Sequence, residues 1–196
     1  SESILRLIPS GQPLTILDLA CGIGTHAVYW AEQGHQVTAI DLSETFIAAA
    51  KKRAIEKGVE VDFEVHDVTA LDYDDTFDVV TWIEYPFFNE RIIGDILRFL
   101  HKDGYLICDV RNPDHPKTKQ REGNWRTWRE EDGIYCLERH ETDDETGEHE
   151  DVWITIDPHT QLITEKFGRC KHLTTEDKIR IIKHAGFSRV ELRTME

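Results

Sequence analysis

Several features that would point to a particular class of protein are scarce in this chain of 196 residues. It holds only four cysteines, Cys21, Cys108, Cys136 and Cys170, and no two of them form a C-x-x-C pair. The scarcity argues against a disulfide framework. No group of histidines, cysteines and carboxylates has the spacing typical of a metal site, so the sequence predicts no metal. No apolar run approaches the length of a membrane span and no signal segment follows Ser1, so we expect a cytoplasmic protein with no membrane partner.

Positive charge is also in short supply. The chain has 23 Lys and Arg residues against 38 Asp and Glu residues, which gives a net charge of -15. Such an excess of acid repels a phosphate backbone, so we do not expect a nucleic-acid partner. One basic cluster interrupts the pattern and contains Lys117, Lys119, Arg121, Trp125, Arg126, Trp128 and Arg129. It leaves base stacking with phosphate contact open beside the simpler interpretation of a solvated loop. The sequence gives no indication of the oligomeric state.

What the chain does contain is a buried strand, a glycine turn and a helix start within residues 16–27. Gly22 and Gly24 let the backbone adopt positive φ and let a ligand approach closely. The helix that follows directs free amide hydrogens and a positive dipole end toward the same place, so we expect a small anionic or polar ligand there. The spacing Gly22-x-Gly24-x-x-Ala27 also fits the dinucleotide fingerprint, so the turn alone does not choose the ligand.

Acidic residues follow three successive predicted strands. Asp18 lies at the end of the first, Asp41 ends the second at residues 37–42, and Asp67 ends the third at residues 61–68. A carboxylate such as Asp41 can accept hydrogen bonds from both ribose hydroxyls of a nucleotide cofactor. An isolated acid at a strand end is more often a turn or helix cap, so the binding interpretation depends on the three occurring together.

With these strands in order, the chain resembles the class I S-adenosylmethionine-dependent methyltransferases. That family has a D-x-x-C-G-x-G turn, an acid after strand two and an Asp-Val pair after strand three, here Asp67-Val68. The resemblance covers about residues 15–187. The segment Trp125-Arg126-Thr127-Trp128 also resembles small bacterial and archaeal members of the family that are known only as generic methyltransferases. Ala20 departs from the family's commoner motif, which has a glycine there. Residues 1–11 leave room for little more than a short turn where relatives carry a lid helix.

The resemblance implies S-adenosylmethionine as the cofactor and assigns it a set of residues. Asp18 would bind the ammonium of the methionine part through water, Asp41 the ribose, and Asp67 the adenine amino group. The other cofactor-binding residues that it implies are Ala20, Cys21, Gly22, Gly24, Leu42, Val68, Trp82 and Ile83. No metal is needed for the transfer, because the leaving group is a neutral sulfide.

The acceptor side is predicted from the residues that follow the fourth strand, residues 77–83. Glu84 and Tyr85 stand just past it, where the family faces the transferring methyl group, and either could orient or deprotonate a nucleophile. The sequence leaves open that Tyr85 packs in the core and Glu84 is solvated. We expect a small-molecule substrate with a nitrogen or oxygen nucleophile. The alternatives are an RNA or protein methyltransferase, a non-catalytic S-adenosylmethionine-binding module, and an NAD-dependent oxidoreductase.

Alternation of strands and helices predicts an α/β fold with a Rossmann-like, open and mostly parallel sheet that has helices on both faces. We expect helices at residues 26–34, from a Ser43 cap to residue 58, and from residue 92 to Asp103-Gly104, with a fifth strand at residues 105–110. The second of these helices should place Phe46, Ile47, Ala50 and Ala54 on its buried face.

After residue 112 the apolar period changes to two, which predicts a β-meander with a hairpin turn at residues 144–147. His140 and His149 flank that turn and are expected to be exposed. Thr174 or Thr175 should cap a later helix, and the resemblance makes residues 187–192 an antiparallel last strand. We therefore expect one methyltransferase domain, residues 1–196, in which the meander at about residues 113–173 is an insertion after strand five that caps the acceptor side.

Overall fold

The structure is a computed structural model, and it describes seven stretches of the chain: residues 12–73, 76–83, 89–109, 123–130, 133–143, 148–171 and 173–193. The chain divides into two compact units. The first comprises Ser1–Val110 and Ile179–Glu196, and the second comprises Arg111–Lys178. Among the described residues, no helix is both long enough and apolar enough to cross a membrane.

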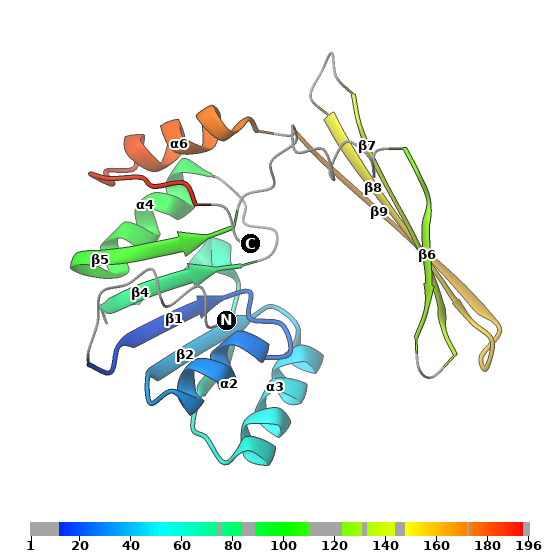
Figure 1. Cartoon of the computed structure of the whole chain (residues 1–196), viewed down its shortest axis with the longest axis horizontal. Coiled ribbons are helices and arrows are strands. Elements are labelled where there is room, and N and C mark those ends of the chain that lie inside the picture. The colour runs from blue at the N-terminus through cyan, green and yellow to red at the C-terminus, as the bar shows by residue number, and fades with distance from the viewer. Residues whose placement is uncertain are drawn as a thin grey trace. The chain divides into compact units, whose positions relative to one another are not determined.

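A five-stranded parallel sheet forms the centre of the first unit (Figure 1). Its strand order is β3-β2-β1-β4-β5, and every pair of neighbouring strands is parallel. The strands are β1 (Thr15–Leu19), β2 (Gln36–Asp41), β3 (Asp62–Val65), β4 (Phe77–Trp82) and β5 (Leu100–Cys108). The predicted open, mostly parallel sheet is confirmed.

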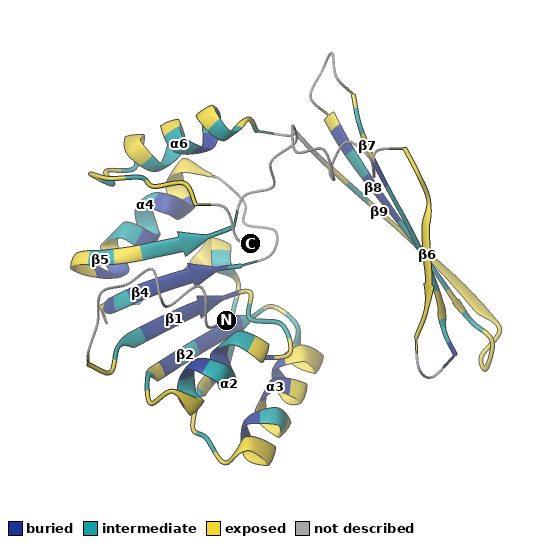
Figure 2. Cartoon of the chain, in the orientation of Figure 1, coloured by how far each residue is buried: buried dark blue, intermediate teal, exposed yellow. Residues whose placement is uncertain are grey.

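Helices pack on both faces of this sheet because successive strand residues point to opposite sides. Their bounds are α2 (Thr25–Glu32), α3 (Glu44–Lys57), the short 3₁₀ helix η1 (Val68–Ala70), α4 (Glu90–Phe99) and α6 (Thr175–His184). Ile16 of β1 lies in an apolar cluster with α2 and α3. Leu17, the next residue, lies in a second cluster with α4. Figure 2 shows that β1, β2 and β4 are largely buried, whereas much of β5 is exposed or half-buried.

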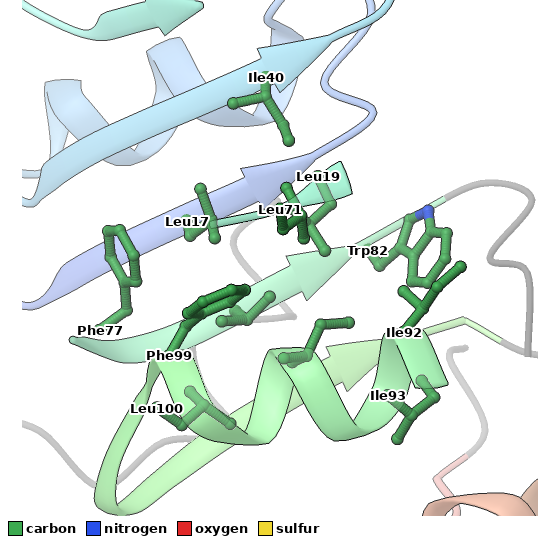
Figure 3. Close-up of a cluster of buried hydrophobic side chains, with 12 residues drawn as sticks. Leu17, Leu19, Ile40, Leu71, Phe77, Trp82, Ile92, Ile93, Phe99 and Leu100 are labelled. Carbon is green, nitrogen blue, oxygen red and sulfur yellow. The ribbon is translucent and has the colours of Figure 1, made fainter. Parts of the chain in front are cut away.

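The second apolar cluster holds the largest buried side chains of the α4 face (Figure 3). Phe99 and Ile96 of α4 lie in this cluster together with Leu17 and Val80 of the sheet. Trp82, the last residue of β4, also lies in it. Ile181 and Ile182 of α6 are partly buried against it. This packing fixes the carboxyl ends of β1 and β4, where the candidate site lies.

The caps of the helices agree with the sequence. The Ser43 hydroxyl accepts a hydrogen bond from the backbone N–H of Phe46, so Ser43 caps α3 as predicted. Thr174 caps α6, since its hydroxyl accepts from the backbone N–H of Asp177. One expected core residue is wrong: Phe46 is 48% exposed, whereas Ile47, Ala50 and Ala54 of the same helix are buried.

Three predicted boundaries are corrected. Helix α4 ends at Phe99, and β5 already begins at Leu100, which pairs with Phe77. The Asp103-Gly104 signal is an irregularity within β5, where Asp103 has φ 73° and the register shifts, and not a helix end. Strand β3 stops at Val65, because Asp67 turns the chain into η1.

The antiparallel last strand expected at residues 187–192 is absent from the described part of the chain, which continues to residue 193 without a strand after α6. Phe187 still packs against the second apolar cluster, so its burial there does not require a place in the sheet.

The second unit contains an antiparallel sheet of four strands in the order β6-β7-β8-β9, which confirms the predicted meander. The strands are β6 (Arg126–Arg129), β7 (Tyr135–Thr142), β8 (Glu148–Asp157) and β9 (Leu162–Lys171). The predicted hairpin turn at residues 144–147 lies outside the described residues. That the meander is an insertion in a single domain, capping an acceptor, stays a prediction.

Candidate functional site

The carboxyl ends of β1, β2, β3 and β4 form the candidate site. From β1 the chain proceeds outward to β2 and β3, then returns to place β4 on the other side of β1. Ligands of open α/β sheets bind beside such a switch point, outside the carboxyl ends of the strands. The glycine turn that follows β1 lies there, so fold and sequence indicate the same location.

The turn after β1 has a left-handed backbone at three of five positions. Ala20, Gly22 and Gly24 have φ values of 54°, 55° and 72°. Ala20, which stands where the family's commoner motif has a glycine, therefore has a positive φ that glycine adopts more readily. A Cβ built on Gly24 would lie 2.8 Å from the Cβ of Ala50, so glycine is required there for the close packing of the turn against α3.

Asp41 ties this turn to the end of β2. One carboxylate oxygen accepts from the backbone N–H of Gly22 at 2.8 Å, and the other accepts from the backbone N–H of Ser43 at 2.9 Å. The backbone N–H of Cys21 donates to the carbonyl of Ile40 at 2.9 Å and adds a second link between the same segments. Each carboxylate oxygen has a further acceptor position, so the structural bonds leave Asp41 able to receive ribose hydroxyls as well.

Asp18 is a buried acid at the switch point itself. It lies opposite Thr81 across the β1–β4 pair and is only 2% exposed. The Thr81 hydroxyl donates to one carboxylate oxygen at 2.7 Å, whereas the other oxygen has no hydrogen-bond partner among the described residues. Burial raises the pKa of the Asp18 carboxyl to about 7, and the Thr81 hydrogen bond acts in the opposite direction without cancelling it.

Cys21 lies between these two acids and is held as a neutral thiol. Burial, and then the negative charges of Asp18 and Asp41, raise the pKa of its thiol well above the usual range. A thiolate is the nucleophilic form of cysteine, so this residue does not serve as a nucleophile. Its contribution to a ligand would come from the backbone of the turn, as the sequence predicts.

The third acid, Asp67, has a structural task. One of its oxygens accepts from both the backbone N–H and the hydroxyl of Thr69, each at 2.8 Å, so Asp67 caps η1. These hydrogen bonds hold the pKa of the Asp67 carboxyl below its usual value. Val68 is partly buried against the second apolar cluster, and Leu42 is 72% exposed. Contact of these residues with an adenine ring stays a prediction.

The remaining predicted residues lie at or beyond the end of β4. Trp82 is buried in the second apolar cluster, and Ile83 is partly buried against the first. Glu84 and Tyr85, the predicted catalytic residues, lie outside the described residues. All these assignments stay predictions.

The predicted basic cluster is described only in part, since Lys117, Lys119 and Arg121 lie outside the described residues. Arg126 pairs with Glu138, and Arg129 stacks on the ring of Tyr135. These two side chains of the cluster are therefore engaged with neighbours on the second sheet.

A polar cluster on β7 and β8 was not predicted from the sequence. His140 and His149 were expected to be exposed, but they are only 5% and 3% exposed, and both hydrogen-bond to Asp151. The expectation is wrong because strand pairing buries both rings. No histidine and carboxylate group has metal-ligand spacing in the sequence, but the fold brings one possible ligand atom from each of His140, His149 and Asp151 within 4.8 Å of one another. The pairing of β7 with β8 brings together residues that no local motif connects.

Known proteins support the same class of fold. Residues 16–104 match the family model described as a methyltransferase domain. The cypemycin N-terminal methyltransferase of a Streptomyces species is 34% identical over 121 residues, which cover 56% of this chain and 48% of that protein. The chain spans about half or less of the length of the first curated relatives that it matches.

Two solved structures are similar in fold. An S-adenosylmethionine-dependent methyltransferase from Clostridium acetobutylicum has a TM-score of 0.72 at 16% identity, over 87% of this chain and 72% of that one. A sugar N-methyltransferase from a Streptoalloteichus species has a TM-score of 0.73 at 20% identity, over 94% of this chain and 77% of that one.

The parallel sheet, its switch point and the glycine turn define a Rossmann-like domain with the site at which nucleotide-type cofactors bind in such folds. The family model over residues 16–104 and the curated relatives support a class I S-adenosylmethionine-dependent methyltransferase, which the sequence predicted. The two solved structures share the fold.

The raised pKa of Asp18 predicts a pH-dependent stability. Its carboxyl titrates at about 7 in the folded chain and near 3.8 when unfolded, so the folded chain loses stability as pH rises from about 4 to about 7. Asp18→Asn cannot ionise and keeps an oxygen for the Thr81 hydroxyl. We expect it to be more stable than the wild type by about 1–4 kcal/mol at pH 8, and the difference to shrink toward pH 4.

Chemical denaturation of both proteins between pH 4 and pH 8 measures this difference. Asp72→Asn, which changes an exposed acid, is the control and should show no such trend. A difference between Asp18→Asn and wild type that stays constant with pH would contradict the assignment.

Proposed function

We propose that the chain binds S-adenosylmethionine at the carboxyl ends of β1, β2 and β3 and transfers its methyl group to a nitrogen or oxygen atom of a small molecule. The observation that carries this proposal is the buried carboxylate of Asp18, which has one oxygen without a partner beneath the glycine turn. An uncompensated buried carboxylate is costly in an isolated domain, and a cationic ligand above the turn would offset that cost.

The residues present fit this cofactor. The left-handed positions at Gly22 and Gly24 bring backbone close to a ligand without intervening side chains. Asp18 favours the ammonium of the methionine part through water, and Asp41 has acceptor positions left for the ribose hydroxyls. Leu42 is an exposed apolar side chain directly after Asp41, and with Val68 it would pack on the adenine ring near Asp67.

The cofactor supplies a methyl group on a sulfonium that leaves as a neutral sulfide, so the chain's own task is positioning. Holding a nucleophile collinear with the breaking bond can lower a barrier by roughly 7–11 kcal/mol. The fixed turn between β1 and α2 provides a rigid reference for that alignment, because hydrogen bonds to Asp41 and Ile40 hold it from β2. Glu84 and Tyr85 remain the proposed residues for orienting or deprotonating the acceptor.

A small-molecule acceptor is favoured over a nucleic acid by charge. The net charge of -15 opposes a polyphosphate chain, and Arg126 and Arg129 are engaged with Glu138 and Tyr135. The names of two similar proteins, a sugar N-methyltransferase and an N-terminal methyltransferase, agree with methylation of nitrogen. An RNA or protein substrate, a silent binding module and an NAD-dependent oxidoreductase are the competing functions.

Replacement of Asp41 tests the cofactor site. We expect Asp41→Asn to weaken binding of S-adenosylhomocysteine, because the variant loses the negative charge that strengthens hydrogen bonds from the ribose. Asp41→Ala removes both acceptor oxygens, and we expect it to weaken binding by about 2–4 kcal/mol. Asp41→Asn keeps one oxygen acceptor for the turn and separates binding from folding. Calorimetric titration measures the affinity.

Asp62→Asn is the matched control, since Asp62 is an exposed acid at the opposite end of the neighbouring strand β3. It should bind like the wild type. Affinity unchanged in both Asp41 variants would mean that this carboxylate only fixes the turn. Thermal stabilisation by NAD, and by neither sulfur cofactor, would replace the methyltransferase proposal with the oxidoreductase.

The acceptor class is tested with cofactor that carries a labelled methyl group. When the protein is incubated with this cofactor and a fractionated cell extract, we expect label to enter small metabolites. Label in RNA that is lost in Arg126→Ala would favour the nucleic-acid alternative. Cofactor binding without any labelled product would favour the silent module.

A further inference from the structure

The strongest unassigned feature is a buried polar cluster on one face of the second sheet. Because side chains alternate along a strand, Glu138, His140 and Thr142 of β7 lie on one face, and His149 and Asp151 of β8 lie on that same face. The register places His140 opposite Asp151 and Thr142 opposite His149. Five polar side chains therefore gather where two central strands pair.

Both imidazole rings converge on one carboxylate. His149 Nε2 lies 2.8 Å from Asp151 Oδ1, and His140 Nδ1 is bonded to the same oxygen. One nitrogen from each ring and this oxygen lie within 4.8 Å of one another. The rings are stacked, with centroids 5.9 Å apart and planes 11° from parallel. All three side chains are buried, so the convergence is held by the sheet.

The second nitrogen of each ring is also held. His140 Nε2 is bonded to the carboxylate of Glu138, and His149 Nδ1 lies 2.8 Å from the hydroxyl of Thr142. Histidines that ligate metals usually donate their other N–H to a carboxylate or another oxygen, which fixes the ring and the tautomer. Both histidines of the cluster have such an outer partner in place.

The second unit also has little apolar material to stabilise it. Val152 is the only apolar side chain buried among its described residues, and the cluster occupies the buried part of the sheet. Units with a small apolar core are commonly stabilised by disulfides or metals. Cys136, on the same unit, forms no disulfide with any described residue.

We infer that His140, His149 and Asp151 bind a single divalent transition-metal ion, with Glu138 and Thr142 as the outer partners that orient the two imidazoles. Two imidazole nitrogens and one carboxylate oxygen are a donor set that suits Zn²⁺, with solvent completing the coordination. The ion would offset the charge of the buried Asp151 carboxylate and of the half-buried Glu138 carboxylate, and it would join β7 to β8. The site belongs to the second sheet and does not depend on the proposed methyl transfer.

Titration of the full chain with metal tests this inference. After treatment with a chelator and its removal, we expect the protein to bind one equivalent of Zn²⁺ saturably and to unfold at a higher temperature with the ion bound. Co²⁺ should give the visible absorption bands of a four- or five-coordinate site. Mg²⁺, which prefers oxygen ligands, should not compete with Zn²⁺.

Variants locate the site. His149→Ala should abolish the Co²⁺ bands and raise the Kd for Zn²⁺ at least 100-fold. Thr142→Val, which conserves shape and removes only the outer partner, should raise the Kd by about 10–100-fold. His101→Ala is the matched control, since His101 is an exposed histidine of the first unit and should have no effect.

Two results would overturn the inference: no saturable binding of Zn²⁺ or Co²⁺ to the wild type, or the same affinity and the same Co²⁺ bands in wild type and folded His149→Ala. If His149→Ala fails to fold, as judged by circular dichroism, the Thr142→Val comparison decides. In the absence of metal binding, the cluster is a hydrogen-bonded network of two histidines and two acids.

Discussion

The buried carboxylate of Asp18 is the constraint on which the first unit depends. Asp18 belongs to β1 and lies opposite Thr81 of β4. One of its carboxylate oxygens accepts a hydrogen bond from the Thr81 hydroxyl, and the other has no hydrogen-bond partner among the described residues. Sheet packing on both faces keeps this acid away from water, and that burial raises its pKa to about 7. Such a group lowers the stability of a folded domain, but it provides a negative charge for binding a cation beside the turn. The same tension between stability and binding is common at functional sites.

Much of the first unit could be predicted from sequence because its signals are local. Ser43, the glycine turn and the apolar strand residues act within a few positions of one another, so the helices, the strands and the position of Asp41 followed directly. The end of α4 did not follow, because Asp103-Gly104 marks a register shift that exists only through pairing with β4. The absent last strand was an inference from family resemblance, and Phe187 packs against the second apolar cluster without a strand there.

The second unit shows what local reasoning misses. The meander was predicted from its period of two, yet His140 and His149 were treated one at a time and expected to be exposed. A hairpin centred between Glu145 and Thr146 already pairs His140 with Asp151, and the observed register of β7 and β8 agrees with that pairing. If the strand register had been derived from the predicted turn, the sequence would have predicted that His140, His149 and Asp151 lie close together. The burial of its rings could not have been predicted, because it depends on the whole sheet.

The central claim, that Asp18 is ionised by a cationic cofactor above the turn, is tested most directly by counting protons. Titration with S-adenosylhomocysteine at pH 7, in two buffers of different ionisation enthalpy, measures the protons released on binding. A nearby ammonium lowers the pKa of Asp18 from about 7, so the wild type should release a fraction of a proton and Asp18→Asn should release none. Equal affinity and equal proton release in the two proteins would contradict the claim.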